Sequence, residues 1–202
     1  MKDLNAEWYD SNAAEFCART IAIDMDESRS RFLRHVPPGG RLLDVGCGSG
    51  RDSRRFVELG YEVEARDRSS VMVAEARRLT GLPVVVEDVL EMRDVAAFDG
   101  IWACAMLLHF EESEFRVAVQ RLARALKPNG ALFISLKQCE RVSNGDSRTF
   151  RFWSLDAAIA ELCAARSVGE QHTHFELAEN WVVREAGPRE VCWVNVVVRK
   201  RA

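Results

Sequence analysis

The sequence lacks any long uninterrupted stretch of apolar residues. Its longest apolar run, from Ile101 to Leu108, is far shorter than the roughly 20 residues that a bilayer-spanning helix needs. The opening residues 1–5 contain no apolar signal core, so we expect a cytoplasmic protein with no membrane partner. A chain of 202 residues is long enough to bury one full hydrophobic core, and we expect a single domain over residues 1–202.

The sequence also has no excess of basic residues and no paired cysteines. Its 28 lysine and arginine residues face 31 aspartate and glutamate residues, which gives a net charge of -3. This balance argues against a broad phosphate-binding surface and favours a small molecule over a nucleic acid as the partner. Six cysteines occur without a C-x-x-C pair, so we expect reduced thiols and no zinc ribbon. His172 and His174 lack a third ligand at a useful spacing, so we expect no metal site.

From residue 41 onward, strand-like segments alternate with segments of helical periodicity. Expected strands cover residues 41–46, 61–66, 84–86, 98–104, 131–136, 171–177 and 191–199, and expected helices cover 52–59, 70–79, 111–126 and 155–165. This order predicts an α/β fold with a mostly parallel, doubly wound sheet and helices on both faces. Ligands of such sheets bind beyond the carboxyl ends of the strands, so the chemistry is expected in the strand-to-helix loops.

The most specific stretch is the loop after the first expected strand, where Gly46, Gly48 and Gly50 are separated by single residues. Glycine allows a ligand to lie directly on the backbone, and the helix that follows adds free N–H groups. A dinucleotide loop would read G-x-G-x-x-G, whereas here the third glycine comes one residue early. Asp44 precedes the loop and would repel a pyrophosphate, so a cationic ligand fits this loop better.

Two further acids stand at the ends of the next two strands. Asp67 follows Gly46 by 21 residues, where a carboxylate can accept both hydroxyl groups of a ribose. Asp88 ends the third strand and, beside the N–H of Val89, can hold the edge of an adenine. A helix cap is the alternative reading of Asp67, and a solvated turn acid that of Asp88. The arrangement at three successive strand ends favours the ligand reading.

In these motifs the chain resembles the class I S-adenosylmethionine-dependent methyltransferases, in their small-molecule and tellurite-resistance-like branch. The resemblance covers nearly the whole chain and rests on residues 9–20, 43–50, 67–72, 87–89, 98–109 and 126–132. It implies a Rossmann-like, seven-stranded, mostly parallel sheet with an antiparallel last strand. It also implies a helical lid over residues 1–40 and a cofactor-binding α/β core over residues 41–202.

The same resemblance implies S-adenosylmethionine as the cofactor, with S-adenosylhomocysteine as its product. The residues that it implies for cofactor binding are Tyr9, Arg19, Asp44, Gly46, Cys47, Gly48, Gly50, Asp67, Arg68, Met72, Asp88, Val89, Ala103 and Cys104. Within this set Asp67 would hold the ribose and Met72 would pack on the adenine. Arg68 stands where the family usually has an aliphatic residue.

Methyl transfer needs a general base only when the acceptor carries a proton, and His109 is the candidate. A core or capping histidine is the alternative reading of this residue. The candidates for contacting the acceptor are Lys137, Glu140, Arg148, Arg151 and Trp153. The two arginines in this set can bind an anionic acceptor, or they are solvated loop cations.

The leading hypothesis is a methyltransferase that acts on an unidentified small molecule, as a monomer or a homodimer. A nicotinamide-dependent dehydrogenase is the alternative among enzymes, and the glycine spacing and Asp44 disfavour it. A non-catalytic binding or regulatory module of the same fold is the alternative of another class. The atom that accepts the methyl group stays open at this point, because oxygen, nitrogen, sulfur and chalcogen oxyanions all fit.

Overall fold

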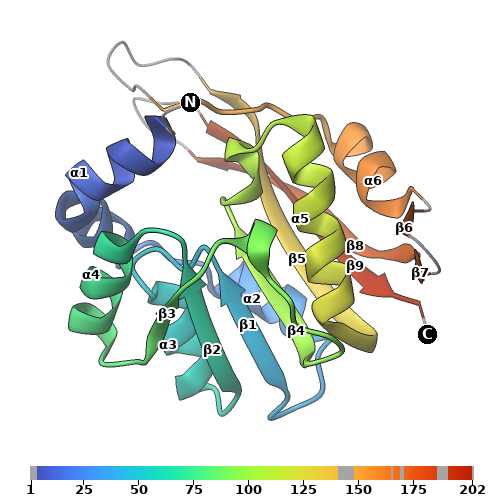
Figure 1. Cartoon of the computed structure of the whole chain (residues 1–202), viewed down its shortest axis with the longest axis horizontal. Helices are drawn as coiled ribbons and strands as arrows, with labels where there is room; N and C mark the ends of the chain where they lie inside the picture. Colours follow the sequence, from blue (N-terminus) through green and yellow to red (C-terminus); the bar gives the residue numbers. More distant parts are fainter. Residues whose placement is uncertain (1–3, 141–147, 165, 169–170, 186–190, 202) are drawn as a thin grey trace.

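Strands and helices alternate along the chain from residue 41, and most of the strands assemble into one sheet (Figure 1). The computed structural model describes residues 4–140, 148–164, 166–168, 171–185 and 191–201. In this part of the chain, seven strands form a sheet in the order β3-β2-β1-β4-β5-β9-β8. The last strand, β9, lies between β5 and β8 and runs antiparallel to both. The expected Rossmann-like sheet with an antiparallel last strand is confirmed.

The helices are α1 (Leu4–Thr20), α2 (Asp26–Leu33), α3 (Arg51–Glu58), α4 (Ser70–Thr80), α5 (Glu112–Ala125) and α6 (Leu155–Cys163), with short 3-10 helices η1 (Val89–Glu91) and η2 (Leu107–His109). The sheet strands are β1 (Arg41–Val45), β2 (Glu62–Asp67), β3 (Val84–Val86), β4 (Phe98–Cys104), β5 (Leu126–Glu140), β8 (Phe175–Glu185) and β9 (Val191–Lys200). Strands β6 (Arg166–Val168) and β7 (Gln171–Thr173) pair separately as a small hairpin.

The two faces of the sheet bury different side chains, because successive residues of a strand point in opposite directions. Leu43 and Ile101 belong to a cluster that α5 and α6 cover. Their neighbours Leu42 and Trp102 belong to a second cluster, which α2 and α3 cover. In that second cluster the Trp102 ring stacks on Phe133 with 3.8 Å between ring centroids. This aromatic core lies directly below the carboxyl ends of β1, β4 and β5, where the site is expected.

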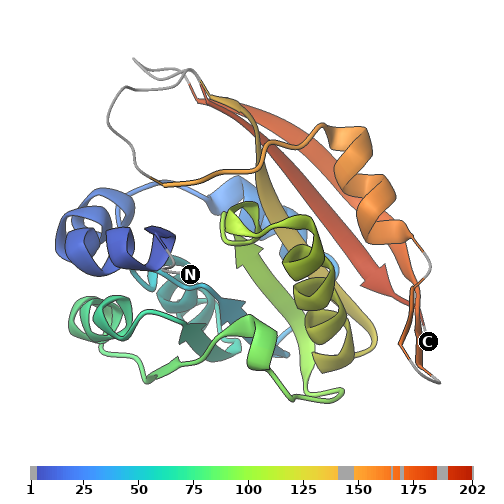
Figure 2. The ribbon, with the colours of Figure 1, turned by 45° about the horizontal axis from the view of Figure 1, so that its top comes forward.

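The N-terminal arm, residues 1–40, contains two helices with different packing. Helix α1 lies beside α4 at the rim of the sheet (Figures 1 and 2), where Ala13 and Cys17 pack against Met72. Helix α2 instead inserts Phe32 into the aromatic core, where it is fully buried. Only α1 is therefore placed as a lid, and α2 is part of the body of the fold.

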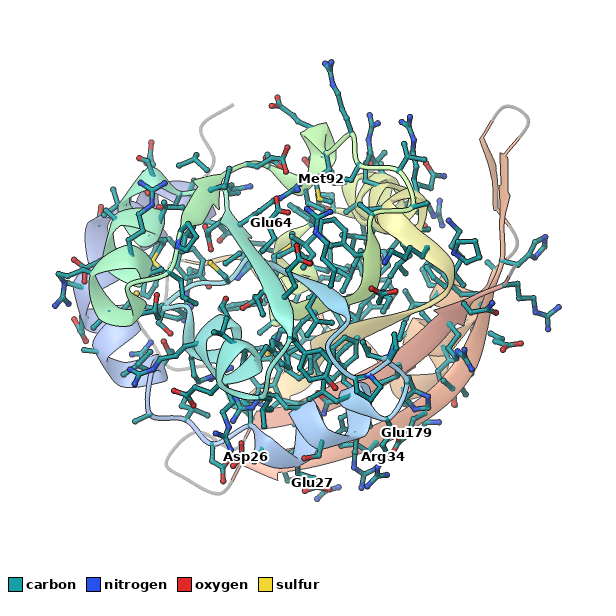
Figure 3. The ribbon with its side chains drawn as sticks, turned by 90° about the horizontal axis from the view of Figure 1, so that it is seen from below. Asp26, Glu27, Arg34, Glu64, Met92 and Glu179 are labelled. Carbon is teal, nitrogen blue, oxygen red and sulfur yellow. The ribbon has the colours of Figure 1, made fainter. Side chains whose placement is uncertain are left out.

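Two strands extend beyond their expected bounds. A strand was expected to begin at Ala131, but β5 already begins at Leu126, which pairs with Phe98 before a register shift. Another strand was expected over residues 171–177, but this segment is divided between β7 and β8, and β8 continues to Glu185. Strand β8 contains several polar residues because it lies at the edge of the sheet. There Glu179 accepts a hydrogen bond from Arg31 of α2 at 2.9 Å, beside Arg34 (Figure 3).

A buried carboxylate joins α2, α3 and β4 below the glycine loop. Asp52 accepts hydrogen bonds from Arg29 of α2, from Arg51 at 2.6 Å, and from the indole N–H of Trp102 at 3.0 Å. Arg29 and Asp52 are both almost fully buried. Charges taken out of water are tolerated only when such partners compensate them.

We predict that Asp52→Ala lowers the free energy of unfolding by about 3–5 kcal/mol, because Trp102 and the buried Arg29 lose their buried acceptor and Arg29 keeps the half-exposed Asp26. Urea unfolding followed by circular dichroism measures this. The matched control is Glu58→Ala on the same helix, because the ion pairs of Glu58 with Arg54 and Arg55 are exposed. The control should change stability by no more than about 1 kcal/mol. Equal effects of the two substitutions would contradict the assigned role of Asp52.

Candidate active site

A cavity of about 1000 Å³ opens at the carboxyl ends of β1, β2, β4 and β5, under α1. Sheet order reverses between β1 and β4, so the loops after these two strands diverge and leave a crevice. Most of the residues expected to bind cofactor line this cavity, namely Tyr9, Arg19, Asp44, Gly46, Cys47, Gly48, Asp67, Arg68, Met72, Asp88, Val89 and Cys104. The topology thus gathers residues that are far apart in sequence.

The glycine loop forms one wall of the cavity and has no room for side chains. Gly46 has φ +67°, and a Cβ there would come within 2.8 Å of the Met106 side chain. Gly48 also has positive φ, and its N–H donates to the Asp67 carboxylate at 3.0 Å. A glycine cradle of this shape lets a ligand lie against the backbone.

The acids at the strand ends differ in their surroundings. Asp67 accepts from the backbone N–H groups of Gly48 and Ser69, both at 3.0 Å, and burial raises its pKa. Asp88 accepts from the N–H of Leu90 and so caps η1. Asp44 lies under the loop, where burial first and the nearby Asp52 charge second raise its pKa to about 7. Each carboxylate oxygen has a second lone pair, so a bound ligand can still donate to Asp67 or Asp88.

Two of the residues expected to bind cofactor do not line the cavity. Gly50 is the N-cap of α3, and a Cβ there would come within 2.8 Å of Thr80, so this glycine allows α3 and α4 to approach closely. Ala103 points to the opposite face of the sheet and is fully buried in the core under α5. Its neighbour Cys104 points into the cavity because strand residues alternate.

Helix α1 covers the cavity and is fastened by side-chain hydrogen bonds. Asp10 accepts from the hydroxyl of Ser69, and Thr20 donates to Ser49 at 3.3 Å. Asn5 accepts from the N–H of Thr149 at 2.8 Å at the other end of the helix. These bonds add to the buried apolar packing of Ala13 and Cys17 of α1 against Met72 of α4.

His109 ends η2 with both ring nitrogens engaged. Nδ1 lies 3.0 Å from the carbonyl oxygen of Thr149, which can only accept, so Nδ1 carries the proton. Nε2 therefore has the free lone pair and accepts from the Tyr9 hydroxyl at 2.9 Å. Burial first, and then the charges of Arg148, Lys137 and Arg68, lower the pKa of His109 to about 4. The imidazole is neutral at pH 7 with its lone pair in the cavity.

The residues expected to contact the acceptor fall into two groups. Lys137 and Arg148 line the cavity next to His109. Arg151 instead pairs with Glu112 at 3.0 Å, and Trp153 is buried in the core against Phe115, because the chain after β5 turns toward α5. The side chain of Glu140 lies outside the described residues.

The lining residues that the sequence reasoning did not name include three polar ones that lie next to the expected site residues. Ser135 of β5 and Asn195 of β9 are register partners and form a buried polar floor. Arg51, next to the glycine loop, also lines the cavity. Ser135 and Asn195 are polar residues within apolar strands, which could have indicated a site. The sequence alone does not show which face of a strand opens to a cavity.

The described residues contain no group of three histidine, cysteine, aspartate or glutamate side chains placed to hold a metal ion. Among the helices in this part of the chain, none is long and apolar enough to cross a membrane.

Comparisons with known proteins agree with the geometry of the cavity. Residues 42–130 match the family model of a methyltransferase domain. The chain is 34% identical over 137 residues to a malonyl-[acyl-carrier protein] O-methyltransferase of Enterobacter lignolyticus, which covers 62% of this chain and 54% of that protein. It is 38% identical over 105 residues to a ubiquinone biosynthesis O-methyltransferase of Xanthomonas oryzae pv. oryzae, covering 48% and 43%. The chain thus spans about half the length of these curated relatives.

A solved structure matches the fold over almost the whole chain. It is a 1,6-didemethyltoxoflavin-N1-methyltransferase from Burkholderia thailandensis with bound 1,6-didemethyltoxoflavin and S-adenosylhomocysteine. The TM-score is 0.75 with 22% sequence identity, and the match covers 98% of this chain and 88% of the other. At this identity the likeness establishes the fold, and the residues of the site have to be argued from this structure.

The residues present fit S-adenosylmethionine. The cradle at Gly46 and Gly48 leaves backbone open to a ligand, and the carboxylates of Asp67 and Asp88 follow at the next two strand ends. Met72 supplies a buried apolar surface beside them. Placement in the tellurite-resistance-like branch stays a prediction. The methyltransferase-domain match, the relatives and the fold all support a class I S-adenosylmethionine-dependent methyltransferase.

Proposed function

We propose that this protein transfers a methyl group from S-adenosylmethionine to an oxygen atom of a small molecule that carries a hydroxyl group. The observation that carries the proposal is the bond from the Tyr9 hydroxyl to the lone pair of His109 Nε2, inside the cavity of the glycine loop. This histidine already accepts a hydrogen bond from a phenol, so it is placed to take a proton from an acceptor hydroxyl. The curated relatives named as O-methyltransferases support the choice of oxygen.

In the proposed reaction each part of the cavity has a separate task. The bound cofactor supplies an electrophilic methyl group, whose bond to sulfur breaks, with the electron pair kept by sulfur, as the bond to oxygen forms. Gly46, Gly48, Asp67, Asp88 and Met72 hold the cofactor. His109 Nε2 takes the acceptor proton, and the Thr149 carbonyl keeps the imidazole in the required tautomer. Helix α1 excludes water, which supports in-line transfer by orientation.

The first prediction separates this proposal from the dehydrogenase alternative. Asp67→Ala should weaken S-adenosylhomocysteine binding by about 1–3 kcal/mol, because charged hydrogen bonds to the ligand are lost. Isothermal titration calorimetry measures this, with Glu62→Ala as control at the opposite, exposed end of the same strand. An unchanged affinity would place the ribose acid elsewhere. Binding of NAD without binding of S-adenosylhomocysteine would overturn the proposed function.

The second prediction concerns turnover. His109→Ala should lower kcat by roughly 10²- to 10⁴-fold while leaving S-adenosylhomocysteine affinity unchanged, because only the proton transfer loses its base. The assay uses the hydroxyl compound that turns over fastest in a panel, with the methyl ether identified by mass spectrometry. His174→Ala, which removes an exposed imidazole, is the control. Wild-type turnover in the His109 variant would remove this residue from the mechanism.

The third prediction concerns the protonation of His109 itself. Tyr9, Thr149, Arg148, Lys137 and Arg68 act on this ring, and the lowered pKa of about 4 means that its neutral form persists from pH 8 down to about pH 5. The imidazole C–H signals in NMR spectra measure this, with His109→Gln to assign the resonance. An unperturbed histidine would titrate near pH 6.5 instead. A midpoint there would contradict the buried, neutral base.

A further inference from the structure

The floor of the cavity is polar, whereas the same strand face is apolar further from the cavity. Ser135 and Asn195 lie side by side on β5 and β9, and both are buried. Phe133, two residues earlier on β5, points to the same face and belongs to the aromatic core under α2. Polar side chains buried in strands cost free energy unless a partner satisfies them. A floor of this kind suits a ligand with polar groups.

Two cations meet at one aromatic ring beside this floor. Lys137, on the same face of β5 as Ser135, is only 6% exposed, and its Nζ lies 3.6 Å from the centroid of the Phe150 ring. The guanidinium carbon of Arg148 lies 4.9 Å from the same centroid. The His109 ring is also next to Phe150, with 5.1 Å between centroids. Two positive charges and the proposed base therefore surround one point of the cavity.

Charge is divided across the cavity. Every carboxylate among the described lining residues comes from the ends of β1, β2 and β3, from α3, or from the segment around the start of α2. The described lining residues from β4 onward include Lys137 and Arg148 but no acid. Among the described lining residues, the acids therefore lie on the cofactor side together with Arg19, Arg51 and Arg68, and Lys137 and Arg148 lie on the acceptor side. The charges of Lys137 and Arg148 are also one cause of the lowered pKa of His109.

The walls on the acceptor side are aromatic. Trp193 of β9 lines the cavity, with Lys137 Nζ 5.7 Å from its ring centroid. Arg148 also covers the Trp8 ring of α1 at 4.0 Å. Flat aromatic walls favour a planar ligand, since offset and edge contacts between rings are attractive.

We propose that Lys137 and Arg148 bind a carboxylate group of the methyl acceptor, and that this acceptor is a hydroxylated aromatic acid whose ring packs against Phe150 and Trp193. The proposal rests on the proposed function, because His109 takes the proton of the hydroxyl group on that acid. The carboxylate lies beside the two cations at the Phe150 ring, and Ser135 and Asn195 supply hydrogen bonds at the floor. Tyr9 then leaves Nε2 to the acceptor hydroxyl.

The test compares probes that differ only in charge. Hydroxybenzoates and the matching hydroxybenzamides, in all three ring positions, are titrated into the full chain saturated with S-adenosylhomocysteine, and binding is followed by calorimetry. We expect at least one acid to bind roughly tenfold or more tightly than its amide, as expected for a hydrogen-bonded charge pair. Equal affinity of every acid and its amide, or no binding of any acid, overturns the proposal without the need for a variant.

Substitutions then test whether Lys137 and Arg148 bind the carboxylate of the acid. Lys137→Gln and Arg148→Gln should each reduce the preference for the acid severalfold, and Lys137→Glu should favour 3-hydroxybenzylamine over 3-hydroxybenzoate. Arg116→Gln is the control, because this arginine of α5 pairs with Glu112 and Glu161 at the surface. A preference that persists unchanged in both glutamine variants overturns the assignment of these two residues.

Measuring S-adenosylhomocysteine binding before the acids are added tests the proposed function separately from the proposed acceptor. S-adenosylhomocysteine affinity of each variant is measured first, together with its circular dichroism spectrum. If the wild-type chain does not bind S-adenosylhomocysteine, the proposed function is wrong. If the wild-type chain binds S-adenosylhomocysteine but binds each acid and its amide equally well, only the proposed class of acceptor is wrong.

Discussion

The buried carboxylate of Asp52 is the interaction on which the rest of the site depends. It receives hydrogen bonds from α2 through Arg29, from the start of α3 through Arg51, and from β4 through Trp102. A buried charge with three donors cannot lose one of them cheaply, so these elements keep fixed positions around the glycine loop. Arg51 also donates to the carbonyl of Thr20, so the end of α1 shares the same anchor.

The order of strands turns this rigid base into a site with two sides. Because β1 and β4 are neighbours whose following loops diverge, the crevice between them opens at the glycine loop on one side and at His109 on the other. Carboxylates collect on the first side, and Lys137 and Arg148 on the second. The cofactor and the proposed anionic acceptor would thus meet different sets of charged side chains within one cavity.

Helix α1 links closure of the cavity to the state of the base. The Tyr9 hydroxyl receives a hydrogen bond from Arg148 at 3.2 Å and donates one to His109 Nε2. The lid therefore satisfies the imidazole with a phenol of its own chain. Burial keeps that imidazole neutral, so exchanging the Tyr9 hydroxyl for an acceptor hydroxyl requires no change in its protonation.

The α/β class, the mostly parallel sheet and the ligand loop can be predicted from the sequence, because Gly46, Gly48, Asp67 and Asp88 follow strands whose periodicity is visible locally. The sequence also indicates His109, Lys137 and Arg148 as candidates. It does not show that Gly50 and Ala103 lie outside the cavity, that Trp153 is a core residue, or that Ser135 and Asn195 form the cavity floor, which follow from the folded structure. Strand alternation indicates only which residues share a face. Which face a helix covers, and where that cover ends, depends on packing between distant segments.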